Sequence, residues 1–143
     1  MTISSFLTSQ HRECDEIFAL AEESLSAKDW NKTRENFDKF SANMLAHFAR
    51  EENILFPDFE SATGMTGGPT QMMRVEHTQM RDLLNQMAQA VQKEDKNGFF
   101  GVAETLHIMI QQHNMKEEQI LYPMCESHLG QQADQLIERL KKN

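Results

Sequence analysis

The 143-residue sequence predicts an all-α protein, folded as an up-down-up-down four-helix bundle with a short C-terminal fifth helix. Glycine (6 residues) and proline (3 residues) are scarce, and strong helix formers such as Leu, Met, Ala, Glu, Gln and Lys dominate. Between the turn signals, apolar residues recur every three or four positions, which is the spacing of one helix face. The length suits a single domain over residues 1–143.

Turn and capping residues mark where each helix begins and ends. Ser4 and Ser5 can cap a first helix, and Pro69, after a glycine-rich turn, suits the first position of a third. Gly98 opens a fourth helix and Gly130 precedes a fifth. The expected helices span roughly residues 5–28, 29–61, 69–96, 98–128 and 131–142, with short linkers that make neighbours antiparallel.

Polar residues that can bind a metal interrupt the apolar stripe of all four long helices. On the fourth helix the stripe reads Ala103, Leu106, Ile110, His113, Glu117, Ile120 and Met124. Across the four helices the polar stripe positions are His11, His47, Glu51, His77, His113 and Glu117. Their heights along an antiparallel bundle agree to within about 6 Å at 1.5 Å per residue, so we expect all six in one layer.

Four of these residues lie in two stretches that repeat each other, HFAREENILFP from His47 and HNMKEEQILYP from His113. Each stretch places a histidine and, four residues later, a glutamate on one helix face. Pro57 and Pro123 close the stretches and should kink or end the helices there.

The six residues predict a metal centre. Two buried glutamates without a cation would carry a desolvation cost of several kcal/mol each. Nitrogen and carboxylate ligands without thiolate favour iron or manganese, and six ligands exceed what one tetrahedral zinc uses. We expect two non-haem iron ions, oxo- or hydroxo-bridged, with Glu51 and Glu117 joining them and open positions for water or a small gas. A ferritin-like site would repeat a Glu-x-x-His motif, which occurs once, off the stripe, at Glu104 and His107.

Composition limits the partners and the cellular location. The net charge of −8, with no Lys/Arg cluster before the Lys141-Lys142 tail, argues against nucleic acid. No apolar run reaches the roughly 20 residues that span a bilayer, and the first residues are not a signal sequence, so we expect a cytoplasmic protein without a membrane partner. Cys14 and Cys125 form no CxxC motif and should lie roughly 20 Å apart, too far for a disulfide.

Together, His11, the doubled HxxxEE-x-I-L-aromatic-Pro stretch and Glu76-His77 resemble the hemerythrin-like (HHE cation-binding) family over nearly the whole chain. The resemblance implies a di-iron bundle that binds dioxygen or nitric oxide, or senses iron or oxygen. It also implies roles for six residues: terminal ligands His11, His47, His77 and His113, and bridging ligands Glu51 and Glu117.

The chain departs from the oxygen-carrying hemerythrins at two points. They have a fifth histidine four residues from the histidine of the third helix, where this chain has Met73 and Arg81. They bridge with an aspartate five residues after the histidine of the fourth helix, where this chain has Glu117 four residues after. The set is closer to the bacterial HHE subgroup, which includes the di-iron domain of iron–sulfur cluster repair proteins.

Two functions therefore compete. The first is binding of O₂ or NO for sensing, storage or stress response. The second is a di-iron enzyme or iron donor in iron–sulfur cluster repair or in NO or peroxide detoxification. A third reading is a helical module that the metal only stabilises. The sequence leaves open turnover, a redox partner and a homo-oligomer.

Several residues near the site keep two interpretations. Glu52 and Glu118 either accept hydrogen bonds from ligand histidines or are solvated. Arg81 either pairs with Glu76 or neutralises the site, or lies free on the surface. Cys14 either lines a gas pocket or fills the core as a small apolar residue.

Overall fold

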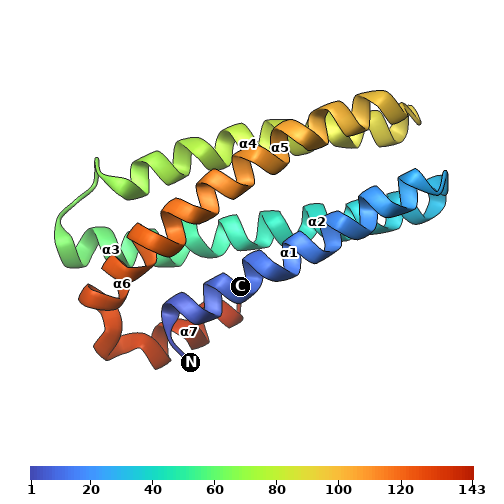
Figure 1. The fold of residues 1–143 in the computed structure, drawn as a ribbon. Helices are drawn as coiled ribbons and strands as arrows, with labels where there is room; N and C mark the ends of the chain where they lie inside the picture. The colour runs from blue at the N-terminus through green and yellow to red at the C-terminus, as the bar shows by residue number, and fades with distance from the viewer.

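A computed structural model describes all residues, 1–143, and confirms the all-α class, because it contains helices and turns but no strand. The long helices are α1 (Ile3–Ser26), α2 (Trp30–Arg50), α4 (Pro69–Gln92) and α5 (Lys96–Lys116). The short helices are α3 (Phe56–Thr63), α6 (Tyr122–Leu129) and α7 (Ala133–Lys141), the last after a 3₁₀ turn at Gly130–Gln132. In Figure 1, α1 lies beside α2 and α4 beside α5, while the short helices gather at one end.

The connections from α1 to α2 and from α4 to α5 are built alike. Lys28 and Glu94 adopt φ values of 60° and 52°, the left-handed conformation that ends a helix. Asp29 and Asp95 follow, and the side chain of each accepts a backbone N–H from three residues ahead at 3.0 Å. These short reversals fold each pair of long helices together.

The helices predicted over 29–61 and 98–128 are each interrupted. A π-helical turn follows α2 at Glu51–Leu55 and another follows α5 at Glu117–Leu121, after which α3 and α6 begin. Pro57 and Pro123 take the second positions of α3 and α6, where a missing N–H is tolerated. The helical path therefore continues through both prolines.

The π turns change which residues face the core. A π turn holds more residues than an α turn, so positions beyond it rotate relative to a 3.6-residue period. The prediction that Ile120 continues the core stripe is wrong, because Ile120 is 56% exposed although Ile54, at the equivalent place of the other π turn, is buried. Met124 is partly buried and packs against buried apolar residues. Leu121, Tyr122 and Cys125 are buried instead.

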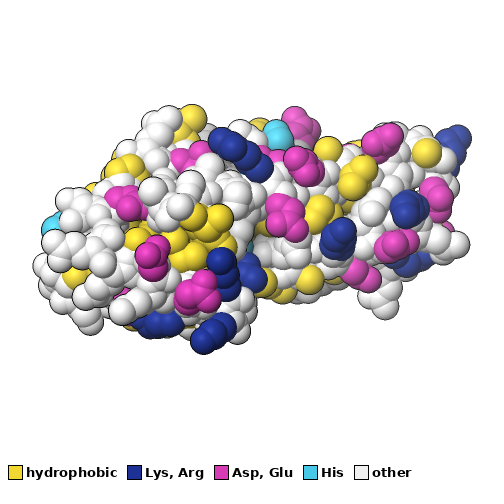
Figure 2. Space-filling model, turned by 90° about the horizontal axis from the view of Figure 1, so that it is seen from below, with side chains coloured by type: hydrophobic (Ala, Val, Ile, Leu, Met, Phe, Trp, Pro, Cys, Tyr) yellow, Lys and Arg dark blue, Asp and Glu magenta, His cyan; other side chains and the backbone are white.

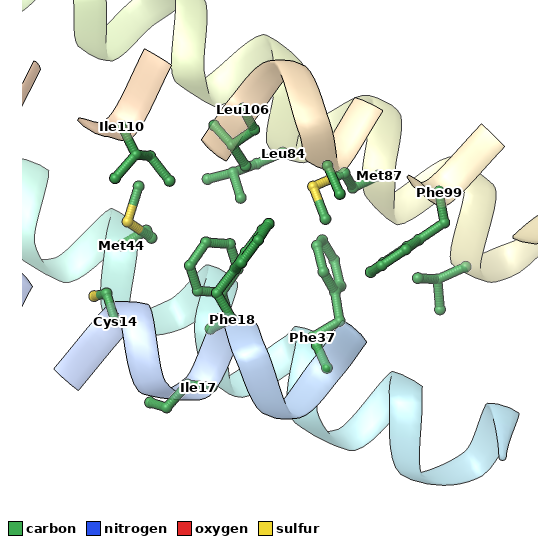
Figure 3. Packing of buried hydrophobic residues seen from close by; sticks show 14 of the residues in the cluster. Cys14, Ile17, Phe18, Phe37, Met44, Leu84, Met87, Phe99, Leu106 and Ile110 are labelled. Carbon is green, nitrogen blue, oxygen red and sulfur yellow. The ribbon is translucent and has the colours of Figure 1, made fainter. Parts of the chain in front are cut away.

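The apolar core is divided in two along the bundle. One cluster lies toward the helix reversals and includes Phe18, Phe37 and Phe99, whose rings pack together with Met87 in Figure 3. The other includes residues of both π turns and of α3, α6 and α7. Buried methionines fill both clusters, as a flexible apolar side chain can.

The two cysteines belong to different clusters, Cys14 to the first and Cys125 to the second. Both are buried and free, which agrees with the expectation that they do not form a disulfide. Cys14 packs among apolar residues, as a small core residue does.

The surface carries charges of both signs. On the face seen in Figure 2, acidic and basic side chains are interspersed. None of the helices combines the length and the apolar character that crossing a membrane requires.

The two halves of the bundle share one arrangement of helical elements, although most of their residues differ. A constant offset of 66 positions relates His11 to His77, His47 to His113 and Glu51 to Glu117. The same offset relates the two Asp caps, the two π turns and the two prolines that follow them. The repeat therefore extends well beyond the HxxxEE stretches in which the sequence shows it most plainly.

Candidate metal centre

The six polar stripe residues meet in one layer between the two apolar clusters. Each of the four long helices supplies one histidine, and each π turn supplies a glutamate as its first residue. All six side chains are buried, with exposed fractions between 0% and 5%: His11, His47, Glu51, His77, His113 and Glu117. The geometry thus brings together every residue that the sequence singled out as a metal ligand.

The histidines form two pairs. The Nε2 atoms of His11 and His47 lie 3.1 Å apart. The rings of His77 and His113 lie 4.9 Å apart between centroids. In both pairs one ring comes from the first helix of a half and the other from the second helix of the same half.

The two carboxylates reach both histidine pairs. Glu117 Oε1 lies 2.9 Å from His11 Nε2 and 3.3 Å from His113 Nε2. Glu51 Oε1 lies 3.4 Å from His47 Nε2 and 3.1 Å from the Nε2 of His77. Two groups of donors can hold a cation, one around each histidine pair, and Glu117 belongs to both.

Four buried atoms in this layer have no hydrogen-bond partner. They are Glu51 Oε1, His77 Nε2, His113 Nε2 and Glu117 Oε2. A buried polar atom left unpaired costs about 1–3 kcal/mol, so such atoms are rare in folded proteins. Nitrogen and carboxylate oxygen donors converging without thiolate fit iron or manganese well.

Each histidine turns its Nδ1 outward to a hydrogen-bond acceptor. The pairs are His11 with Glu118 at 2.7 Å, His47 with Gln10 at 2.8 Å, His77 with Glu52 at 2.6 Å and His113 with Glu76 at 2.8 Å. Metal-binding histidines typically have such a partner, which fixes the ring orientation and leaves the other nitrogen for the metal. Glu52 and Glu118 therefore take the hydrogen-bonded role that the sequence left open. The sequence pattern did not predict that Gln10 and Glu76 accept hydrogen bonds from ligand histidines.

Two of the outer carboxylates are held by cations. Arg81 donates two hydrogen bonds to Glu52, at 2.9 and 2.8 Å, and Lys116 donates to Glu76. Arg81 therefore pairs with Glu52 and not with Glu76. Burial raises the pKa of Glu52, but the hydrogen bonds from His77 and Arg81 outweigh burial and lower that pKa to about 2.

In the absence of a cation, protons balance the buried carboxylates. Burial lowers the pKa of His47, but the charges and hydrogen bonds of Glu51 and Glu117 outweigh it and raise the pKa to about 10. Burial also lowers the pKa of His113, but the negative charge of Glu117, which is the largest opposing influence, raises it to about 9. A bound metal would displace these protons, because it takes neutral imidazole as its ligand.

Tyr122 reaches into the layer, which the pattern of the sequence did not predict. Its hydroxyl donates to Glu51 Oε2 at 2.6 Å and lies 3.0 Å from Glu117 Oε1. Burial, and then the charges of Glu117 and Glu51, raise the pKa of Tyr122 well above its usual value. The residue lies five positions after Glu117, off a 3.6-residue stripe, and the π turn brings it inward.

Aromatic rings cover the His77 side of the layer. The Phe48 ring stacks on His77 with centroids 4.1 Å apart, and Phe56 stacks at 5.8 Å. The two remaining histidines lie outside the site: His107 stacks on Phe18 and His128 packs edge-on against the ring of Phe59.

A helical bundle with a buried layer of four histidines and two shared carboxylates defines a class, that of helical cation-binding proteins. The family model of the Hemerythrin HHE cation binding domain matches residues 2–125 of this chain. The chain therefore belongs to that family, which confirms the resemblance seen in the sequence. Comparison with curated proteins and with solved structures gives no match.

Proposed function

We propose that the protein binds two iron ions in this layer and uses them to bind a small diatomic molecule, O₂ or NO, for sensing, storage or stress response. The proposed ligands are His11, His47, Glu51, His77, His113 and Glu117. The proposal includes the up-down-up-down order of the long helices, a single domain over residues 1–143 and a cytoplasmic location. It needs no nucleic acid or membrane partner.

One observation carries the proposal of two ions. The donors form two separate groups, one around His77 and His113 and the other around His11 and His47, and Glu117 is common to both. Glu51 also lies within 3.4 Å of one histidine from each pair. Shared carboxylates between two pairs of imidazoles suit a dinuclear centre better than a single tetrahedral ion.

The surrounding residues prepare the site for a small ligand. The outward acceptors hold each histidine with Nε2 toward the centre, and Phe48 and Phe56 exclude water beside His77. Bound iron would supply open coordination positions and a reversible change of oxidation state. The Met73 side chain carries no nitrogen and Arg81 is tied to Glu52, so neither adds a nitrogen ligand where carriers have a fifth histidine.

The metal content tests the proposal. Aerobically purified protein should contain about two irons per chain and show the near-ultraviolet absorption of a bridged ferric pair. The His47→Ala/His113→Ala double variant should lose the iron, whereas the His107→Ala/His128→Ala control should keep it. One zinc and no iron in the wild-type protein would refute the proposal.

Anaerobic titration of the ferrous protein with O₂ and with NO tests the ligand. A stable and reversible adduct supports a binding protein. Rapid oxidation with turnover of peroxide or NO would instead favour the alternative, a di-iron enzyme or iron donor.

A further inference from the structure

The repeat allows the two proposed metal positions to be compared residue by residue. The histidines and glutamates at the centre are the same in both halves at the offset of 66. The innermost difference is at the aromatic residue five positions after each glutamate, which is Phe56 in one half and Tyr122 in the other. Both residues are fully buried.

The Tyr122 hydroxyl lies among the donors of one position. Its oxygen is 3.2 Å from His11 Nε2, 3.4 Å from His47 Nε2 and 3.0 Å from Glu117 Oε1. Those three atoms lie 3.1, 2.9 and 3.8 Å from one another. Four atoms at such separations surround a point about 2 Å from each, which is a usual distance from a metal to nitrogen and oxygen ligands.

The position at His77 and His113 has no phenol, so with both carboxylates shared it has four donors against five at the position of His11 and His47. The ring of Phe56 stacks near His77 and carries no polar atom. The donors there are two imidazoles and the two shared carboxylates. The chain contains one tyrosine, so no second phenol is available.

We propose that Tyr122 is a further ligand of the metal bound by His11 and His47, and that a small molecule therefore binds the other metal, beside Phe56. On coordination the phenolic O–H bond breaks, its electron pair forms the metal–oxygen bond and the proton leaves to solvent. No electron is transferred in this step. The assignment rests on the proposed iron site, whose positive charge makes a buried phenolate favourable.

The position of the Tyr122 ring supports this role. The ring stacks on His11 at 5.7 Å between centroids, with 23° between the planes. It is held at the start of α6 by the π turn, so the oxygen lies beside the donors without a rearrangement of the helices.

Spectroscopy of iron-loaded protein tests the assignment. The apoprotein is loaded with ferrous iron without oxygen and oxidised with ferricyanide. We expect a visible phenolate-to-iron absorption band and phenolate vibrations in resonance Raman spectra. Tyr122→Phe should lose both and keep about two irons. Zinc-loaded wild-type protein, the control, should show no band.

Azide titration of the ferric protein tests which metal is open. Wild-type protein should bind one azide per chain and Tyr122→Phe two, because the variant frees a position on the second metal. Equal stoichiometry would overturn the assignment of the open metal.

The outcomes separate this inference from the proposed function. Wild-type protein that holds two irons but lacks the phenolate band refutes the role of Tyr122 and leaves the iron site standing. Wild-type protein that takes up no iron refutes the proposed function itself. The wild-type spectrum alone tests whether Tyr122 is a ligand, even if the variant fails to fold, because Tyr122 is the only tyrosine and so the only source of phenolate.

Discussion

The outward hydrogen bonds of the histidines are the most informative features at the scale of single residues. Three of the four acceptors are carboxylates and the fourth is the neutral amide of Gln10. A carboxylate acceptor raises the basicity of the imidazole and thereby strengthens its bond to a metal. Each acceptor should therefore contribute to metal affinity without touching the metal.

Replacing Glu52 with Gln tests this contribution. The amide keeps the shape but removes the charge that accepts from His77 Nδ1 and pairs with Arg81. We expect metal affinity to fall by about 10- to 100-fold, as is usual for the loss of such a partner. Competition with a chelator measures it.

Glu138→Gln is the matched control, because Glu138 is exposed and pairs with Lys141 alone. Its affinity should equal that of the wild type. A Glu52→Gln variant with wild-type affinity would show that this carboxylate does not support the metal.

The thiols offer a second test at the residue scale. Burial, and then the charge of Glu13, raise the pKa of Cys14 to about 12, and burial also raises the pKa of Cys125. Because the thiolate is the nucleophile, iodoacetamide at pH 8 should label both cysteines slowly in folded protein and rapidly in urea. Mass spectrometry follows the labelling. Fast modification of Cys14 in the folded protein would favour the gas-pocket interpretation over a packed core residue.

At the scale of elements, prediction from sequence succeeds up to the two glutamates and only in part after them, since Ile54 continues the stripe and is buried whereas Ile120 is exposed. The 3.6-residue period holds along the α-helices, so the stripe identifies all six central residues. Beyond Glu117 the π turn changes the period and brings Tyr122 inward, off the 3.6-residue stripe, so that the stripe does not predict it. Pro123 signals a break in the helix, but a proline does not specify a π turn in place of a kink.

The outer acceptors Gln10 and Glu76 were missed for a different reason. Each precedes a site histidine in sequence and reaches the histidine of the neighbouring helix in the same half. Stripe counting along one helix cannot predict such a contact between helices. The offset of 66, which places Gln10 and Glu76 at equivalent positions, is the sequence signal that could have indicated it.

The two tight reversals give a prediction for stability. Lys28 and Glu94 have positive φ, which costs an ordinary residue about 1–2 kcal/mol and glycine little. Glycine also loses more chain entropy on folding, by about 0.5–1 kcal/mol. We therefore expect Lys28→Gly and Glu94→Gly each to raise the free energy of unfolding by about 0.5 kcal/mol. Urea denaturation measures it.

Lys93→Gly is the control for these variants, since Lys93 has a φ of −86° and gains no conformational relief from glycine. It should leave stability unchanged or lower it. A loss of stability in both Lys28→Gly and Glu94→Gly would contradict the role assigned to their backbone conformation.

At the scale of the whole molecule, the buried protons link folding to pH. His47 and His113 have pKa values of about 10 and 9 in the metal-free fold, above the ordinary value of about 6.5 expected when unfolded. Their contribution to stability is therefore complete below about pH 6.5 and is lost as the pH rises through about 9 to 10. The melting temperature of metal-free protein should fall over this range.

Metal-loaded protein should not show this loss, because its histidines are neutral ligands throughout. Calorimetry of both forms between about pH 6 and 10 compares them. A metal-free protein whose melting temperature is constant or rises toward pH 10 would show that His47 and His113 are not protonated in the fold.

The relation between the two halves has a consequence for the two proposed metal positions. If the halves were identical, exchanging them would leave the molecule unchanged, and the two ions would be interchangeable in affinity, potential and access. The halves agree at the central histidines and glutamates but differ at most other positions, including Tyr122 against Phe56 and Gln10 against Glu76. Two ions bound in this layer would therefore differ in affinity, potential and access, which would make the proposed centre directional.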